Sequence, residues 1–261
     1  GRVDHKRMVI VMTLEMLGLL AILVVPLLVA SVLVLFPRRL QHSAGWLAGA
    51  AAGVSLAASL ALIPALRHGA DPVLKLIWVP AAAIEMRLHL DWLALPFLIT
   101  EAGVTLLAIV YTWGYYANGR LAEETDPSTT RGANGHRPRN RIAYFCALLL
   151  LFAVGMSGTT LADDMILFYT FWELMLVASA VLILVWGEAV KGGPRKQTVT
   201  LKYFIFTHMG SLLILIALLI LYDAVGSDSF SALRQGVTLA PALVTTVTTL
   251  FLIGFCVKMA I

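Results

Sequence analysis

The amino-acid sequence predicts an all-α protein, a polytopic bundle of about seven transmembrane helices. Of its 261 residues, 60% are hydrophobic and only 13% are charged, and the mean hydropathy is +0.89. Soluble domains carry about 25% charged residues, so this composition is typical of an integral membrane protein. Apolar runs of about 20 residues, long enough to cross about 30 Å of hydrocarbon, recur along the chain. We therefore expect a single transmembrane domain over residues 1–261.

Seven apolar runs have the length of a spanning helix. They are Leu14–Phe36, Ala44–Leu66, Trp92–Trp113, Ile142–Leu161, Met165–Trp186, Val199–Tyr222, and Ala240 to the end of the chain. The first run follows a basic segment, but it is too long for the apolar region of a signal peptide and ends in FPRR rather than a small-residue cleavage site. We therefore interpret it as a membrane-spanning helix.

The second run carries small residues at every fourth position. They are Gly45, Gly49, Gly53, Ala57 and Ala61. This spacing places them on one helical face, where a neighbouring helix can approach closely. The pattern predicts helix packing and no chemistry.

Two segments between the runs differ from spanning helices. Residues 84–90 (IEMRLHL) alternate between apolar and polar side chains, which is typical of a strand, so a short hairpin outside the membrane fits this region. Residues 114–141 are rich in Gly, Pro, Thr, Asn and Arg and predict a flexible hydrophilic loop.

The basic residues of the loops predict an orientation. The loops after the first, third and fifth runs hold ten Lys and Arg residues, and the other side holds seven, of which three lie in residues 1–7. This bias places the odd-numbered loops in the cytoplasm and the amino terminus outside a plasma (inner) membrane. Residues 1–7 precede the first candidate start, Met8, and the chain ends within an apolar run, so we expect a carboxyl-terminal portion to be missing.

The sequence predicts no cofactor, metal or nucleic-acid partner. The net charge of +4 arises from short loops between apolar runs, as is usual for membrane proteins, so nucleic-acid binding is not expected. Cys146 and Cys256 each lie alone in an apolar run, without Cys or His at the spacing of a metal site. No nucleotide-binding glycine motif is present. We expect no catalytic redox site on this chain.

Ionisable side chains within the apolar runs are the candidate functional residues. A charge at the bilayer centre costs about 2.5–3.5 kcal/mol on insertion scales, so it predicts an ion or proton path. Glu173 lies near the middle of the fifth run and Lys258 lies deep in the seventh, so each needs a partner or a water-filled cavity. A buried Glu and a buried Lys that alter each other's proton affinity are the physical parts of a proton relay.

For three further ionisable residues, the position in the sequence gives weaker support for a functional role. Glu101 lies well inside the third run, and both a structural hydrogen-bonding role and a proton-path role are open for it. His208, a lone histidine in the sixth run, is either a packing residue or a proton relay. Lys202 lies three residues into the same run, and its long stem could lift the ammonium group to the cytoplasmic surface.

The chain resembles the antiporter-like proton-pumping subunits of respiratory complex I, a family shared with Mrp-type antiporters and membrane-bound hydrogenases. The matching stretches are FWELMLVASAVLILVWG (171–187), LKYFIFTHMGSLLILIALLILY (201–222) and FLIGFCVKMAI (251–261), with weaker support from WVPAAAIEMRLHLDWLALPF (78–97). The GSLL step after KYFIFTHM is most similar to the subunit usually called M.

The resemblance implies roles for three charged residues. Glu173 is implied to be the Glu of a mid-membrane ion pair, Lys202 its candidate partner, and Lys258 the Lys of an interrupted seventh helix. The implied protein is a non-redox subunit of an NADH:quinone oxidoreductase that moves protons beside other membrane subunits. Two alternatives stay open. One is a subunit of an Mrp-type Na⁺/H⁺ antiporter or hydrogenase, and the other is a membrane scaffold whose charges only pair and rigidify.

Overall fold

A computed structural model describes residues 2–79, 84–117, 141–187, 193, 195–234 and 238–259. Most of the loop predicted over residues 114–141 lies outside the described residues. Contacts divide the chain into two compact units. Unit 1 comprises Gly1–Ala70 and Trp92–Val154, and unit 2 comprises Asp71–Asp91 and Gly155–Ile261.

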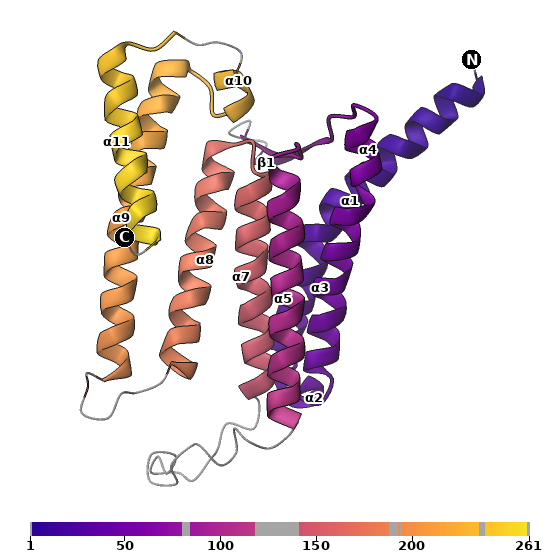
Figure 1. Ribbon diagram of the computed structural model, residues 1–261, viewed down its shortest axis with the longest axis vertical. Coiled ribbons are helices and arrows are strands. Elements are labelled where there is room, and N and C mark those ends of the chain that lie inside the picture. Colours follow the sequence, from indigo (N-terminus) through magenta and orange to yellow (C-terminus); the bar gives the residue numbers. More distant parts are fainter. Residues whose placement is uncertain are drawn as a thin grey trace. The chain divides into compact units, whose positions relative to one another are not determined.

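Unit 1 is built from helices. They are α1 (Arg2–Leu35), α2 (Pro37–Leu40), α3 (Ala44–Ala61), α4 (Ile63–Arg67), α5 (Ala94–Ala117) and the first part of α7 (Arg141–Leu161). Helix α3 packs against both α1 and α5 (Figure 1). The predicted close approach occurs at Gly45, where an added Cβ would lie 2.8 Å from the Trp113 ring, but nothing lies within 4 Å of Gly53. The row of small residues is therefore used for close packing at its beginning.

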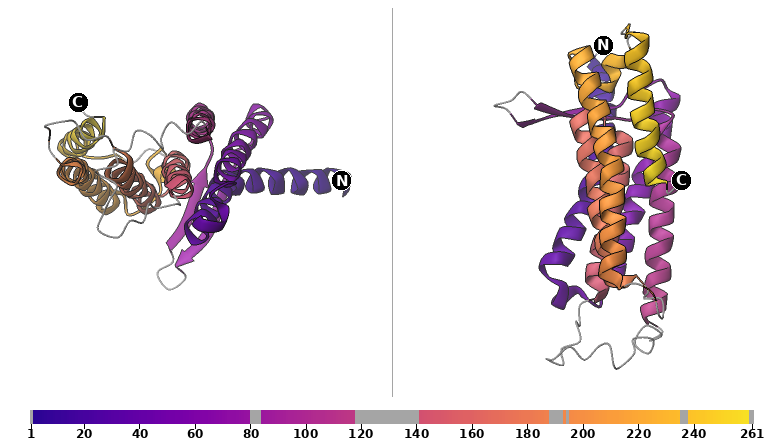
Figure 2. Two further views of the ribbon diagram at one scale, coloured as in Figure 1. Left: turned by 90° about the horizontal axis from the view of Figure 1, so that it is seen from below. Right: turned by 90° about the vertical axis from the view of Figure 1, so that its left-hand side faces the viewer.

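Unit 2 begins with the predicted hairpin. Strand β1 (Val73–Val79) pairs antiparallel with β2 (Ile84–His89), and the pairing sets Val73 opposite His89. The hairpin runs crosswise to helix α9 (Lys196–Val225) of the same unit (Figure 2). Single bridges then join Leu88 to Ala162 and Asp164 to Ser229. The short segment before α8 is thus held between β2 and the residues that follow α9.

The helices of unit 2 pack in sequence around α9. They are α8 (Met165–Trp186), α9, α10 (Phe230–Arg234) and α11 (Pro241–Lys258). Helix α9 contacts α8 on one side and α11 on the other, and Figures 1 and 2 show α9 and α11 side by side. Ile214 and Ala217 of α9 are fully buried in this core. Helix α9 begins and ends three residues beyond the predicted run, and Gly226, with φ of 69°, ends it in the left-handed conformation.

Glycines allow the closest helix contacts of unit 2. A Cβ on Gly254 of α11 would lie 2.6 Å from the Ile214 side chain and 2.8 Å from the Gly210 carbonyl oxygen of α9. A Cβ on Gly158 of α7 would overlap the ring of Phe171 on α8. These positions bring the backbones of neighbouring helices together, as small residues do in membrane proteins.

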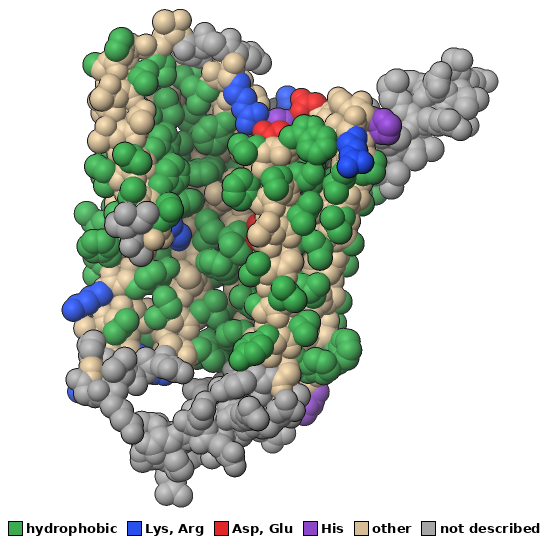
Figure 3. Space-filling model, viewed as in Figure 1, with side chains coloured by type: hydrophobic (Ala, Val, Ile, Leu, Met, Phe, Trp, Pro, Cys, Tyr) green, Lys and Arg blue, Asp and Glu red, His purple; other side chains and the backbone are tan. Residues whose placement is uncertain are grey.

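Within the described residues, seven helices are long and apolar enough to cross a membrane, and they correspond to the seven predicted runs. Large apolar side chains are exposed on their sides, for example Leu107 at 70% and Leu219 at 57%. Figure 3 shows hydrophobic side chains covering the sides of the helices, with most of the visible charged groups near helix ends. The protein is a multi-pass membrane protein, because lipid can cover such a surface and water cannot do so cheaply.

The α9–α11 contact can be tested with Gly254→Ala. The added methyl group would meet the Gly210 carbonyl oxygen, which cannot rotate away. We expect the free energy of unfolding to fall by about 1–3 kcal/mol, the usual cost of overpacking, and a lower thermal midpoint in detergent. Gly53→Ala is the matched control, because nothing lies within 4 Å of its added methyl group. Equal midpoints for the two variants would contradict the close contact.

Candidate functional site

Glu173 lies in the middle of α8. Asp164 caps the start of this 22-residue helix, and its carboxylate accepts a hydrogen bond of 2.8 Å from the backbone N–H of Leu167. Glu173 follows nine residues later, about 13 Å along the helix axis at 1.5 Å per residue. Its side chain is 24% exposed. The carboxylate is therefore far from both helix ends, as the sequence predicted.

Helix α9 supplies two partners for the Glu173 carboxylate. The Ser211 hydroxyl donates a hydrogen bond to Oε1, and Nδ1 of His208 lies 3.2 Å from Oε2. The histidine contact has the distance of an ion pair but not the alignment of a hydrogen bond. His208 and Ser211 are three residues apart, so both face α8. The Tyr169 hydroxyl, one turn before Glu173, interacts with both Ser211 and Glu173.

Lys258 brings a positive charge to the same site from α11. Its Nζ lies 5.4 Å from the centre of the Trp172 ring and is near enough to Glu173 for electrostatic attraction. The Nζ atom is buried and has no hydrogen-bond partner among the described residues. Trp172 also packs edge-on against Phe255, at 5.4 Å between ring centres. The ammonium group is therefore held by an aromatic face and by charge, without a fixed hydrogen bond.

The other predicted site residues lie elsewhere. Lys202 is exposed on α9, six residues before His208, and in the described part of the chain no ion pair involves it. Its predicted pairing with Glu173 stays a prediction. Glu101 is half-buried on α5 of unit 1. The structure thus brings together Glu173, His208 and Lys258 from three helices of unit 2.

Ser211, Tyr169 and Trp172 were not predicted from the sequence. A signal was present, because Ser211 follows His208 by three residues and Tyr169 precedes Glu173 by four. Both spacings place the side chains on one helical face. Searching one turn either side of each buried charge would have found them.

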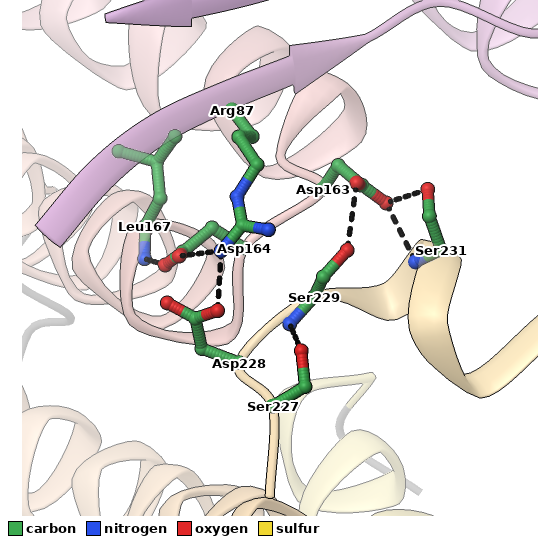
Figure 4. A network of polar contacts seen from close by, with 8 residues as sticks. All are labelled: Arg87, Asp163, Asp164, Leu167, Ser227, Asp228, Ser229 and Ser231. Atoms are coloured by element: carbon green, nitrogen blue, oxygen red, sulfur yellow. Dashed lines mark hydrogen bonds and ion pairs between the residues drawn. The ribbon is translucent and has the colours of Figure 1, made fainter. Parts of the chain in front are cut away.

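A second polar cluster, which we call the carboxylate junction, lies where α8 begins. It consists of Arg87 from β2, Asp163 and Asp164 before α8, and Asp228 after α9 (Figure 4). The Arg87 guanidinium pairs with Asp228 and lies 3.7 Å from Asp164. Asp163 accepts hydrogen bonds from Ser229 and Ser231. The junction ties three separate segments of unit 2 together.

Burial controls the charge of the junction. It raises the pKa of Asp164 to about 6, and hydrogen bonding with Asp228 adds to the effect. Burial also acts to raise the pKa of Asp228, but hydrogen bonds with Asp164 and Arg87 outweigh it and hold that pKa below its ordinary value. One carboxyl group of the pair therefore keeps its proton up to about pH 6, while the other is ionised.

The comparisons with known proteins agree with the fold. Residues 162–261 match the family described as NADH:quinone oxidoreductase/Mrp antiporter, TM. An antiporter subunit of Staphylococcus haemolyticus is 30% identical over 218 residues, which is 83% of this chain and 24% of that protein. NADH-quinone oxidoreductase subunit M of Escherichia coli is 30% identical over 158 residues, 59% of this chain and 27% of that protein.

A solved structure has a similar fold. The Mrp complex from Dietzia sp. contains a chain that superposes with a TM-score of 0.67 and 24% identity, covering 92% of this chain and 23% of that chain. The present chain thus covers about a quarter of the length of each of these three relatives.

The support that Ser211 gives to Glu173 can be tested with Ser211→Ala. The change removes the hydroxyl that donates to the carboxylate, and an unsatisfied buried group of this kind costs about 1–3 kcal/mol. We expect a lower thermal midpoint for the purified protein. Ser31→Ala is the matched control, because the exposed Ser31 hydroxyl donates to the Leu27 carbonyl oxygen of its own helix and, among the described residues, to no carboxylate. An equal effect of the two substitutions would contradict the interaction with Glu173.

The junction predicts a pH dependence of stability. Because the folded-state pKa of Asp164, about 6, lies above its ordinary 3.8, its contribution is full below about pH 4 and is lost as the pH rises through 6. The pKa of Asp228 is lowered, so its contribution is full above about pH 4 and is lost only as the pH falls further, outside that range. Asp164→Asn keeps a good helix cap but cannot ionise. From about pH 5 to about pH 7.5, its thermal midpoint should rise relative to that of the parent.

Asp91→Asn serves as the control for this pH comparison. Asp91 pairs with Arg234 in the same unit, at 3.2 Å, and is not a member of the junction. The difference in thermal midpoint between Asp91→Asn and the parent should not change around pH 6. If the thermal midpoint of Asp164→Asn also differs from that of the parent by the same amount at every pH, Asp164 does not titrate as described.

Proposed function

We propose that this chain moves protons across a membrane within an antiporter-like subunit, because residues 162–261 match the family described as NADH:quinone oxidoreductase/Mrp antiporter, TM. The observation that carries the proposal is the Glu173 site. A mid-membrane carboxylate is held by Ser211 and His208 and attracts Lys258 from a third helix. Charged groups at this depth are costly, and they mark ion and proton paths in membrane proteins.

The site can couple proton binding at Glu173 and His208 to the charge of Lys258. Histidine exchanges protons near neutral pH, and His208 Nδ1 is 3.2 Å from the Glu173 carboxylate. The His208 side chain is 39% exposed, so part of it is accessible from outside the Glu173 site. When Glu173 takes up a proton, its attraction for Lys258 is lost, and the ammonium group keeps only the Trp172 face. Protonation of Glu173 thus changes the electrostatic environment of Lys258.

Lys202 and Glu101 remain candidate relay groups in this proposal. Lys202 lies about 9 Å before His208 along α9, at 1.5 Å per residue, and is exposed near the start of that helix. In the orientation predicted from the basic loops, that end faces the cytoplasm and the amino terminus lies outside. A cytoplasmic ammonium group at this place would lie on the route by which protons reach His208.

We propose that the whole subunit belongs to an NADH:quinone oxidoreductase, where other subunits handle electrons and quinone. The relative in Escherichia coli carries that name. A second candidate is an Mrp-type Na⁺/H⁺ antiporter, favoured by the antiporter subunit that matches over 83% of this chain. A third is a scaffold in which the charges only stabilise helix packing.

Glu173→Gln in the full-length protein, within its assembled complex, tests the proposal. Gln keeps the size and a hydrogen-bonding oxygen but holds no exchangeable charge. We expect NADH-driven proton uptake into membrane vesicles to fall by about tenfold or more, since a lost acid–base group costs at least that much. The complex should still assemble. Asp71→Asn, at a 77% exposed carboxylate, is the matched control.

Two outcomes separate the rivals. Undiminished uptake with Gln at position 173, in an assembled complex, would favour the scaffold. Sodium separates the other two candidates. Proton uptake that requires NADH and does not depend on Na⁺ supports the quinone oxidoreductase. Na⁺-driven proton movement without NADH supports the antiporter.

A further inference from the structure

The carboxylate junction holds more acid than base. Among the described residues, the charged groups that face Asp164 are Arg87 on β2 and Asp228 after α9, so two carboxyl groups share one guanidinium, while the Asp163 carboxylate accepts hydrogen bonds from Ser229 and Ser231. The Asp164 side chain is 1% exposed, and its Oδ2 meets the Arg87 guanidinium only at the distance of an ion pair, 3.7 Å. Burial with only this long ion pair favours the protonated form of the carboxyl group. The junction is therefore suited to hold an exchangeable proton.

A cavity leads from the junction toward Glu173. Its volume is about 320 Å³, and α8, α9 and Asp228 form its walls. Asp228 and Tyr222 lie at the end near the junction, and Tyr169 and Thr170 lie about one helical turn deeper. The remaining five lining residues are apolar. A water molecule occupies about 30 Å³, so several fit beside the polar side chains.

Tyr169 connects the cavity with the Glu173 site. Its side chain lines the cavity, and its hydroxyl interacts with Ser211 and Glu173. Along α8, Tyr169 lies about 7.5 Å from Asp164 and about 6 Å from Glu173, at 1.5 Å per residue. The first step is too long for a direct hydrogen bond and requires water. The second is already bridged by the tyrosine side chain.

We propose that the carboxylate junction is a proton-exchange port for Glu173, in which Asp164 and Asp228 share one proton and pass it through cavity water and the Tyr169 hydroxyl. The inference rests on the proposed function and adds the place where protons enter or leave. In each step an oxygen receives one proton as it releases another, so one proton moves and no electron is transferred. In the predicted orientation, the port faces the outer side of the membrane.

The charge balance of the junction supports this assignment. The pKa of about 6 for Asp164 allows it to take up and release a proton near neutral pH. Arg87 keeps Asp228 ionised beside it, as a ready acceptor. Because Asp228 has the lower pKa, the proton rests on Asp164, and its transfer to Asp228 is an uphill step that makes Asp228 a transient carrier.

Infrared spectroscopy of the full-length protein tests the shared proton directly. Protonated carboxyl groups absorb apart from carboxylates, so the spectrum can be followed as the pH rises from about 5 to about 8. We expect one carboxylic acid band to disappear with a midpoint near pH 6. Asp164→Asn should lack that band, and the control Asp91→Asn should keep it. A parent protein without the band, or an unchanged band in Asp164→Asn, would overturn the proposal.

Proton uptake in vesicles tests the path. Asp164→Asn and Tyr169→Phe should each slow uptake and remove its inflection near pH 6, while Asp91→Asn leaves both unchanged. If Glu173→Gln blocks uptake and these two variants do not, the port is wrong and the proposed function stands. If Glu173→Gln has no effect, the port has no site to serve, and both proposals are wrong.

Discussion

The arrangement of unit 2 depends on the need to satisfy one carboxylate in the middle of a membrane helix. Glu173 can be tolerated there because α9 presents Ser211 and His208 to it and α11 brings Lys258 within electrostatic reach. The approach of α11 in turn requires Gly210 and Gly254, since a Cβ at either position would collide with the opposite helix. Two glycines with no chemistry of their own thus set the position of the Lys258 charge.

The carboxylate junction fixes the other end of the same helix. Asp164 caps α8, Asp163 accepts bonds from the start of α10, and the backbone of this segment bonds to β2 and to Asp228. The hairpin is therefore structurally continuous with the helix that carries Glu173. The junction and the Glu173 carboxylate thus lie on one helix, about 13 Å apart along its axis.

Much of the fold follows from local sequence. The seven apolar runs predicted the seven spans, because backbone groups in lipid must bond within the helix and only length and apolarity are needed. The alternation at residues 84–90 predicted strand β2 for the same kind of local reason. Helix α9 is longer than its apolar run because polar residues such as Gln197 and Asp223 continue the helix past the two ends of that run. Hydropathy does not record such extensions.

The sequence by itself determined which residues are too costly to be accidental. Glu173 and Lys258 were identified from their depth within the apolar runs alone. The free energy of burying a charge depends on the position of that residue, whichever partner it has. Only the tertiary structure decided their partners. The exposed Lys202 lies outside the site, whereas His208, open to a packing role in the sequence, contacts Glu173. Partnership depends on how each helix is rotated and how closely neighbours pack, and those are set by contacts between residues far apart in the chain. The carboxylate junction went unpredicted for the same reason, since its three segments meet only after folding.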